Sequence, residues 1–369
     1  MKTEARPKYK RIVVKIGSNV LTCADGTLDT QRMSALVDQI AALFRSGMEI
    51  IIVSSGAVAS GRGELGARAS LRKLDPVSAR QLFSAVGQAK LINTYYNLFR
   101  NWEIDCGQVL TTKESLSTRN HYLNQKNCMA VMLNSRVIPI VNENDTISVT
   151  ELMFTDNDEL SGMVAAMMNA DALIILSNID GVYNGAPYAE NVEVIREIKS
   201  RNADISDYIH AGKSHFGRGG MITKTRIARK VAAQGIEVVI ANGKRENILA
   251  ELVLHHPSGV VCTRFTPSHR SVSGIKKWIA HSNGFAKGRI CINQGAYEAL
   301  MQPKATSLLP VGVEMVEGNF EKDDIVQIIA PSGQNIGVGR VSLSAEKARQ
   351  TTGKKGAKVL IHYDYMYLD

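Results

Sequence analysis

Cysteine is scarce and scattered in this chain of 369 residues. No two cysteines form a Cys-x-x-Cys pair, and the five of them stand far apart, at Cys23, Cys106, Cys128, Cys262 and Cys291. An odd number at such wide spacing argues against both a disulfide framework and a zinc site. Reduced thiols fit this pattern better, so we expect a cytoplasmic protein.

Long apolar runs are also missing. No stretch approaches the roughly 20 apolar residues that span a bilayer, so we expect no membrane partner. The basic start of the chain is not followed by the apolar segment of a secretory signal. Aromatic residues make up only 6% of the chain and form no run of the kind on which single-stranded nucleic acids stack.

The composition is that of an ordinary globular protein, with 44% hydrophobic and 21% charged residues. A chain of this length predicts two domains. The net charge of +9 is compatible with polyanion binding, but it fits equally well with lysines and arginines that serve nucleotide phosphates. No dense basic run favours nucleic acid.

One stretch, residues 138–162, contains two clusters of acidic and amide side chains within about twenty residues. An apolar run that predicts a buried strand leads into Asn142, Glu143, Asn144 and Asp145, and a second acid-amide cluster at 156–159 precedes a predicted buried helix. Ligands bind at the carboxyl edge of open α/β sheets. Carboxylates and amides together suit a zwitterion, although polar turns with helix caps would also explain them.

Two further strand ends lead into glycine and serine. In the apolar run RIVVKI, Lys15 would be costly to bury unless an anion meets it, and Gly17 follows directly. The next strand ends in Ser54, Ser55 and Gly56, before a run of small residues. Exposed backbone N–H groups at such turns can approach a phosphate. The alternative is an edge strand with an outward-facing lysine.

A glycine-rich segment, HFGRGGMITK, opens a predicted helix from Met221 to Gln234. It is neither a P-loop nor a dinucleotide fingerprint. Lys224 lies in the first turn, where a cation opposes the helix dipole, which predicts a bound anion. A surface turn with a solvated lysine is the alternative.

Strands and helices alternate through most of the chain, which predicts an α/β fold with a mainly parallel sheet in a domain over residues 1–258. The segment 259–273 lacks periodicity and predicts a linker. Short β-like runs and glycine turns in residues 274–369 predict a small, mostly β, barrel-like domain.

Taken in order, the motifs VVKIGSNVLT, IIVSSGAVASG, PIVNENDTIS, TDNDELSG, LSNIDGVY and GRGGMITK resemble the amino-acid kinase family. The NENDT and DNDELSG pair resembles its glutamate-phosphorylating branch, and the C-terminal region resembles a PUA domain. The resemblance implies a parallel sheet between helix layers, plus a PUA-like barrel. The implied reaction is ATP-dependent phosphorylation of the γ-carboxylate of L-glutamate, the first step of proline biosynthesis.

The resemblance also implies roles for individual residues. Lys15 and Lys224 would flank the transferring phosphoryl group, with Asp158 holding both, while Gly17 and Gly56 would offer backbone N–H groups. Glutamate would be bound by residues matching Ser55, Asp145, Asn157 and, less closely, Asn142. ATP would be bound by Lys15, Ser177, Asn178, Arg218, Gly219, Gly220, Met221, Ile222, Thr223 and Lys224. Mg²⁺ would bridge phosphate oxygens, and we name no protein ligand for it.

The chain departs from the family pattern at three positions near the nucleotide. Ser177 and Asn178 stand where Thr-Asp is common, and Arg218 stands where threonine is common. The family also implies feedback inhibition by proline and a homo-oligomer, either a dimer or a tetramer. RNA binding by the PUA-like domain is the less favoured role for it. The alternatives are a kinase for acetylglutamate or aspartate, and an RNA-binding or regulatory protein on an inactive kinase fold.

Overall fold

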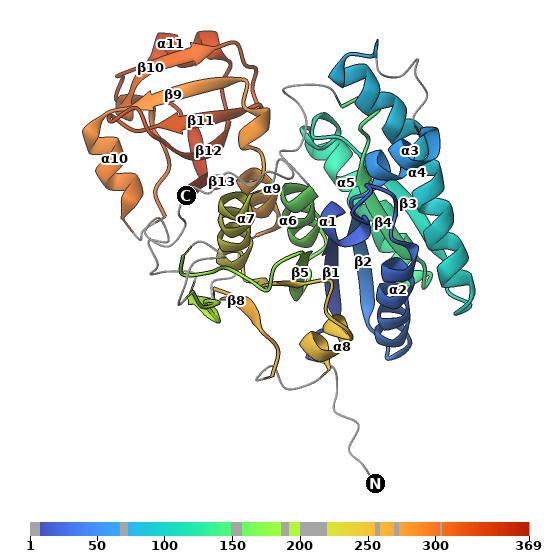
Figure 1. Ribbon diagram of the computed structural model, residues 1–369. Helices are drawn as coiled ribbons and strands as arrows, with labels where there is room; N and C mark the ends of the chain where they lie inside the picture. The colour runs from blue at the N-terminus through green and yellow to red at the C-terminus, as the bar shows by residue number, and fades with distance from the viewer. Residues whose placement is uncertain are drawn as a thin grey trace. The chain divides into compact units, whose positions relative to one another are not determined.

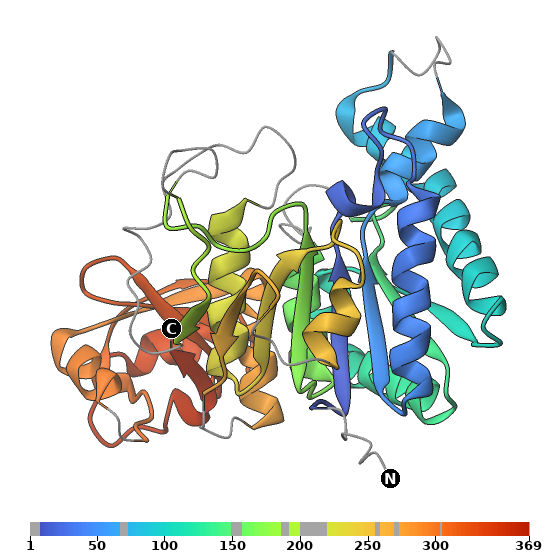
Figure 2. The same ribbon diagram turned by 60° about the horizontal axis from the view of Figure 1, so that its bottom comes forward.

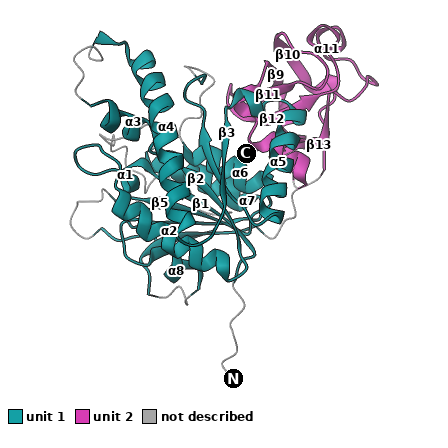
Figure 3. Cartoon of the chain, turned by 90° about the vertical axis from the view of Figure 1, so that its right-hand side faces the viewer, with its two compact units in different colours: residues 1–271 teal, residues 272–369 magenta. Residues whose placement is uncertain are grey.

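The computed structural model describes residues 8–66, 73–148, 157–185, 192–199, 220–254, 259–268, 273–302 and 305–368. The chain divides into two compact units, residues 1–271 and residues 272–369 (Figure 3). Across these described ranges, no helix has both the length and the apolar character needed to cross a membrane.

An eight-stranded sheet forms the centre of the first unit, in the order β3-β4-β2-β1-β5-β7-β8-β6 (Figure 1). Neighbouring strands run parallel except β7 and β8, which are antiparallel, so the predicted mainly parallel sheet is confirmed. The strands are β1 (Arg11–Ile16), β2 (Glu49–Ser54), β3 (Cys106–Thr111), β4 (Ile138–Glu143), β5 (Ala172–Ser177), β6 (Glu197–Lys199), β7 (Glu237–Asn242) and β8 (Cys262–Thr266).

Helices cover both faces of this sheet (Figures 1 and 2). Ile12, Val14 and Ile16 of β1 belong to a core cluster that includes the apolar side of α2. Because side chains alternate along a strand, Lys15 points to the opposite face, where α6 packs. The helices are α1 (Ser18–Leu21), α2 (Thr30–Arg45), α3 (Ala57–Leu65), α4 (Pro76–Arg100), α5 (Arg119–Asn134), α6 (Asn157–Met167), α7 (Met221–Ala233) and α8 (Ile248–Val253).

Helix α4 lies close against α3 because two glycines meet there. A Cβ atom on Gly87 would lie 1.8 Å from the Ala57 carbonyl oxygen, and one on Gly61 would lie 1.8 Å from that of Phe83. The helix begins sharply, since the Asp75 side chain accepts hydrogen bonds from the next backbone N–H groups and Pro76 occupies the first turn. This contact fixes the position of the α4 face that borders the site.

The predicted linker at 259–273 needs correction, because it contains strand β8. This strand pairs with β7 on one side and with β6 on the other, and Phe265 is fully buried. Arg264 donates a hydrogen bond of 2.9 Å to Glu237 of β7. The first unit therefore extends beyond residue 258, to residue 271.

The second unit is built on a five-stranded sheet in the order β10-β9-β11-β12-β13, with its own apolar core. Its strands are β9 (Gly288–Ile292), β10 (Val313–Gly318), β11 (Ile325–Ile329), β12 (Asn335–Val341) and β13 (Ile361–Leu368). The helices are α9 (Gly274–Ala280), α10 (Gln294–Met301) and α11 (Ala345–Thr351). The predicted strand-rich domain is confirmed.

Candidate active site

The carboxyl ends of four neighbouring strands, β4, β2, β1 and β5, meet at one edge of the sheet. Lys15 lies in register with Val53 of β2 and Ile175 of β5. The chain just after β2 is bonded to the end of β1, since the Ser55 N–H donates to the Ile16 carbonyl at 3.0 Å. The sequence motifs that end these strands are thereby gathered into one place.

Two lysines from distant parts of the chain converge on one carboxylate at this edge. Lys15 Nζ lies 2.6 Å from Asp158 Oδ1, and Lys224 Nζ lies 2.9 Å from Asp158 Oδ2. The Asp158 side chain is fully buried, while the Lys15 and Lys224 side chains are 6% and 12% exposed. Burial alone would raise the pKa of Asp158, but the two ammonium groups outweigh it and lower this pKa to about 2.

The local sequence explains how this carboxylate comes to be buried. After its polar first turn, helix α6 consists of small and apolar residues, and nearly all of it is buried. Asp158 lies in its first turn, where the helix dipole favours a negative charge. Lys224 lies in the first turn of α7, which packs against α6, and the carboxylate offsets the unfavourable position of this cation.

The two glycines predicted as backbone donors differ. The N–H of Gly17 donates to the Leu176 carbonyl at 3.1 Å, and its role as a donor to a phosphate stays a prediction. A Cβ there would meet that carbonyl at 3.1 Å and Lys15 Nζ at 3.5 Å, so glycine leaves room for the ammonium group. Gly56 has φ of +106°, which favours glycine, and caps α3.

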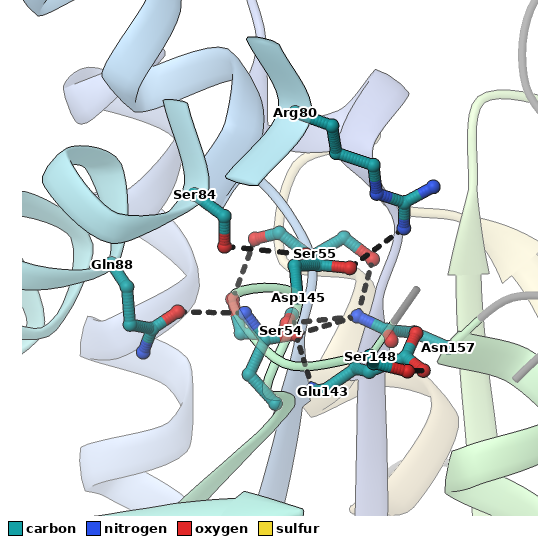
Figure 4. Close-up of polar contacts among 10 residues, drawn as sticks. Ser54, Ser55, Arg80, Ser84, Gln88, Glu143, Asp145, Ser148 and Asn157 are labelled. Atoms are coloured by element: carbon teal, nitrogen blue, oxygen red, sulfur yellow. Dashed lines mark hydrogen bonds and ion pairs between the residues drawn. The ribbon is translucent and has the colours of Figure 1, made fainter. Parts of the chain in front are cut away.

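Asn157 joins the β2 and β4 strand ends through its amide nitrogen. This Nδ2 donates to the Ser54 carbonyl at 3.1 Å, to Ser55 Oγ at 3.1 Å and to Asn142 Oδ1 at 2.9 Å (Figure 4). Three of the predicted glutamate-binding residues are therefore in direct contact. Since Asn157 directly precedes Asp158, this group of polar side chains adjoins the lysine–aspartate cluster.

The fourth predicted residue, Asp145, is held from α4. Arg80 Nη2 lies 2.7 Å from Asp145 Oδ1, and Ser84 Oγ donates to Oδ2 at 3.4 Å (Figure 4). One turn further on, Gln88 Oε1 accepts from Asn142 Nδ2 at 2.7 Å. The sequence analysis missed these three residues. They lie at i, i+4 and i+8 as a polar stripe on one side of α4, but polar residues also stand on the other sides of this helix, so the spacing alone does not identify them.

The residues predicted to bind the nucleotide lie on the other side of Lys15. Ser177 ends β5 and is buried, whereas Asn178 is exposed. Gly220 occupies the N-cap position of α7, and the first turn of that helix is formed by Met221, Ile222, Thr223 and Lys224. Arg218 and Gly219 lie outside the described residues.

The arrangement suits transfer of an anionic group. Two ammonium groups share one buried carboxylate, so the cluster has a net positive charge next to a pocket of amides, a hydroxyl and a carboxylate. Preorganised cations of this kind stabilise the charge on a transferring phosphoryl group. A carboxylate acceptor is ionised at neutral pH and needs no general base.

Family models match both units of the chain. The model of the amino acid kinase family matches residues 10–242, and that of the PUA domain matches residues 288–363. The chain therefore belongs to the amino acid kinase family and carries a PUA domain. The predicted fold is confirmed at both ends of the chain.

Curated relatives align along nearly the whole length. A glutamate 5-kinase of Bacteroides thetaiotaomicron is 63% identical over 99% of this chain and 100% of its own length, and one of Chlorobaculum tepidum is 47% identical over 98% of each. Within its family, the chain belongs with the glutamate 5-kinases. This assignment favours the glutamate interpretation over an acetylglutamate or aspartate kinase and over an inactive kinase fold.

Solved structures support the fold of the first unit. A carbamate kinase from Giardia lamblia bound to AMP-PNP aligns with a TM-score of 0.52 over 71% of this chain and 99% of its own. At 17% sequence identity this likeness shows the fold alone.

Proposed function

We propose that this protein phosphorylates the γ-carboxylate of L-glutamate with ATP, giving γ-glutamyl phosphate and ADP in the first step of proline biosynthesis. The observation that carries the proposal is the convergence of Lys15 and Lys224 on Asp158, beside the hydrogen-bonded amides of Asn157 and Asn142. The identity to glutamate 5-kinases over the full chain supports the choice of substrate.

The two lysines would act on the same phosphoryl group from opposite sides. A γ-carboxylate oxygen attacks the terminal phosphorus of ATP, a new oxygen–phosphorus bond forms, and the bond to the bridging oxygen of ADP breaks. Lys15 stabilises the group from the glutamate side, and Lys224 from the nucleotide side. Asp158 holds both ammonium groups in place, because its buried carboxylate has one oxygen within ion-pair distance of each.

The pocket formed by Ser55, Asn142, Asp145 and Asn157 would hold the amino-acid end of glutamate. Its carboxylate suits the α-ammonium group, while amide and hydroxyl groups suit the remaining polar atoms. Proline carries the same α-amino and α-carboxylate groups, so it would compete for this pocket. Saturating glutamate should then relieve inhibition by proline.

ATP would lie against the carboxyl end of β5, which carries Ser177 and Asn178, and against the start of α7, residues 220–224. Mg²⁺, when bound with the nucleotide, would neutralise part of the charge on its phosphates. The cellular setting that we propose is the cytoplasm, in a homo-oligomer of two or four copies. The second unit would modulate the assembly, in preference to binding RNA.

The proposed reaction can be tested by trapping its product. Hydroxylamine converts an acyl phosphate into a hydroxamate, which is measured by its colour with ferric iron. The protein should form γ-glutamyl hydroxamate only when ATP and glutamate are both present, and Lys15→Met should lower the rate by about 100-fold or more. If the wild type gives no more hydroxamate than this variant, the proposal is wrong.

A further inference from the structure

Arg80 is the part of the amino-acid pocket that the function described so far does not use. It extends from α4 toward Asp145, and these two side chains lie beside Ser55 and Asn157 in one cluster (Figure 4). The Asp145 side chain is 9% exposed and that of Arg80 is 31% exposed. A guanidinium is thus held directly over the carboxylate that would receive the substrate ammonium.

The donors of Arg80 are only partly used. Its Nη2 contacts Asp145 Oδ1 at 2.7 Å, while its Nε is buried and has no hydrogen-bond partner among the described residues. A buried donor without a partner is costly, and a second anion beside the guanidinium would remove that cost. Guanidinium groups bind carboxylates through two parallel hydrogen bonds, which Arg80 could form once its side chain turns and brings Nε to the ligand.

Three other cations described at this edge of the sheet pair with anions outside the proposed amino-acid site. Lys15 and Lys224 both contact Asp158, and Lys113 Nζ lies 3.3 Å from Glu159. Arg80 differs from them because its anion, Asp145, belongs to the amino-acid pocket. An α-amino acid brings an ammonium and a carboxylate on the same carbon, so it can supply a cation to Asp145 and an anion to Arg80 at once.

We propose that Arg80 recognises the α-carboxylate of the amino-acid substrate, while Asp145 receives its α-ammonium group. The inference rests on the proposed function and deepens it, since it names the residue that selects for a free α-carboxylate. Before the substrate arrives, Arg80 acts as the counter-ion of Asp145. On binding, the four charges alternate in sign, and no net charge is added around the α-carbon.

The position of Arg80 on α4 makes this role possible. Ser84 and Gln88 follow at helical spacing, and both are bonded to pocket residues, so that the whole stripe faces the substrate. Gln81 donates to the Thr146 carbonyl at 2.7 Å and ties α4 to the segment that carries Asp145. The backbone of Arg80 is therefore fixed in place, and only its side chain has to turn for the guanidinium to reach a ligand.

Calorimetric titration with two ligands tests the inference on the full chain. The first ligand is L-glutamate, and the second is its α-amide, which keeps the ammonium and the γ-carboxylate but lacks the α-carboxylate charge. Arg80→Met should raise the dissociation constant for glutamate by about 10- to 100-fold. The same variant should change the constant for the α-amide by less than about threefold.

Two more variants separate recognition from folding. Arg80→Lys keeps a counter-ion for Asp145 but not the forked geometry, so it should fold normally and recover part of the preference for glutamate. Arg100→Met, on an exposed residue at the far end of the same helix, should bind both ligands as the wild type does. Thermal unfolding of each variant shows whether the native fold persists.

The outcomes distinguish this inference from the proposed reaction. The inference is overturned if Arg80→Met and Arg80→Lys weaken the binding of both ligands equally, or if they leave the preference for glutamate intact. Either result would show that Arg80 does not recognise the α-carboxylate. Failure of the wild type to bind glutamate would overturn it too. If glutamate binds with the expected preference but no hydroxamate forms, the proposed reaction fails and the recognition by Arg80 stands.

Discussion

The ammonium group of Lys15 and the carboxylate of Asp158 lie 2.6 Å apart, although one ends the first strand of the sheet and the other begins a helix far along the chain. Lys224 completes the cluster from a third segment. None of these groups could be buried alone without a large desolvation cost. Together they form a preorganised cation pair, in which the carboxylate fixes the distance between two lysines that would otherwise repel one another.

Asp158→Asn should abolish most of the activity while leaving substrates able to bind. The amide cannot hold two ammonium groups by charge, so neither lysine would remain in position for the transferring phosphoryl group. We expect kcat in the hydroxamate assay to fall by about 100- to 1000-fold. Asp105→Asn, on an exposed residue ahead of β3, should retain wild-type kcat. A loss below tenfold for Asp158→Asn would contradict the assigned role.

Comparison of the wild type with Asp158→Asn also gives a prediction about pH. The ion pairs hold the pKa of Asp158 at about 2, below its ordinary value of 3.8. The unfolded chain therefore binds this proton more readily than the folded protein, and stability from Asp158 is complete above about pH 4 and lost as the pH falls toward 2. Below about pH 4, the difference in unfolding free energy between wild type and Asp158→Asn should shrink by about 1.4 kcal/mol per pH unit.

Urea denaturation at a series of pH values measures that difference. Other carboxylates titrate in both proteins, so their contributions cancel when the two free energies are subtracted. A difference that stayed constant between pH 5 and about pH 3 would show that Asp158 is not held by the two lysines.

Asn157→Ala should weaken the binding of glutamate more than the binding of ATP. The change removes the amide that contacts the Ser54 carbonyl, Ser55 Oγ and Asn142 Oδ1. Leaving such partners unsatisfied costs about 1 to 3 kcal/mol, so kcat/KM for glutamate should fall by about 10- to 100-fold. The KM for ATP should stay within about threefold, and Asn134→Ala at the exposed end of α5 should have no effect. Equal losses for both substrates would contradict this assignment.

Much of the cluster could be predicted from the sequence because burying any of its charged members without a partner would cost free energy. A lysine inside the apolar run of β1, a lysine in the first turn of α7 and acids before a buried helix each need a partner of opposite charge. Strand alternation and strand order then bring them to one edge. The polar stripe of α4 could not be recognised in this way. An arginine on a helix is ordinarily solvated, and only tertiary packing turns Arg80 inward.

Strand β8 was predicted as a linker for a related reason. The run CTRFT is short and mixed, and its pairing with β6 and β7 depends on strands far from it in sequence. Strand β12, NIGVGRV, contains two glycines that suggest turns. A Cβ on its Gly337 would lie 2.2 Å from the Tyr367 carbonyl oxygen, so β13 requires glycine there. Such a close approach cannot be recognised from local sequence.

The α3–α4 contact gives a prediction about stability. Gly87→Ala would place a methyl group 1.8 Å from the Ala57 carbonyl oxygen, and a helix would have to shift to accept it. We expect a loss of about 3 kcal/mol or more in unfolding free energy, measured by urea denaturation. Gly274→Ala is the matched control, because a Cβ there has no atom within 4 Å and should cost nothing. Wild-type stability for Gly87→Ala would show that α4 is not fixed by this contact.

A crystal structure of the protein with L-glutamate, ADP, Mg²⁺ and aluminium fluoride tests the central claim most directly, because the fluoride complex mimics the phosphoryl group in transit. Both Lys15 Nζ and Lys224 Nζ should lie within about 3 Å of its fluorine atoms, with Asp158 still between the two lysines and the γ-carboxylate in line with the metal fluoride. If either ammonium group pointed away from the fluoride, or if glutamate lay outside the pocket formed by Ser55, Asn142, Asp145 and Asn157, the account would be contradicted.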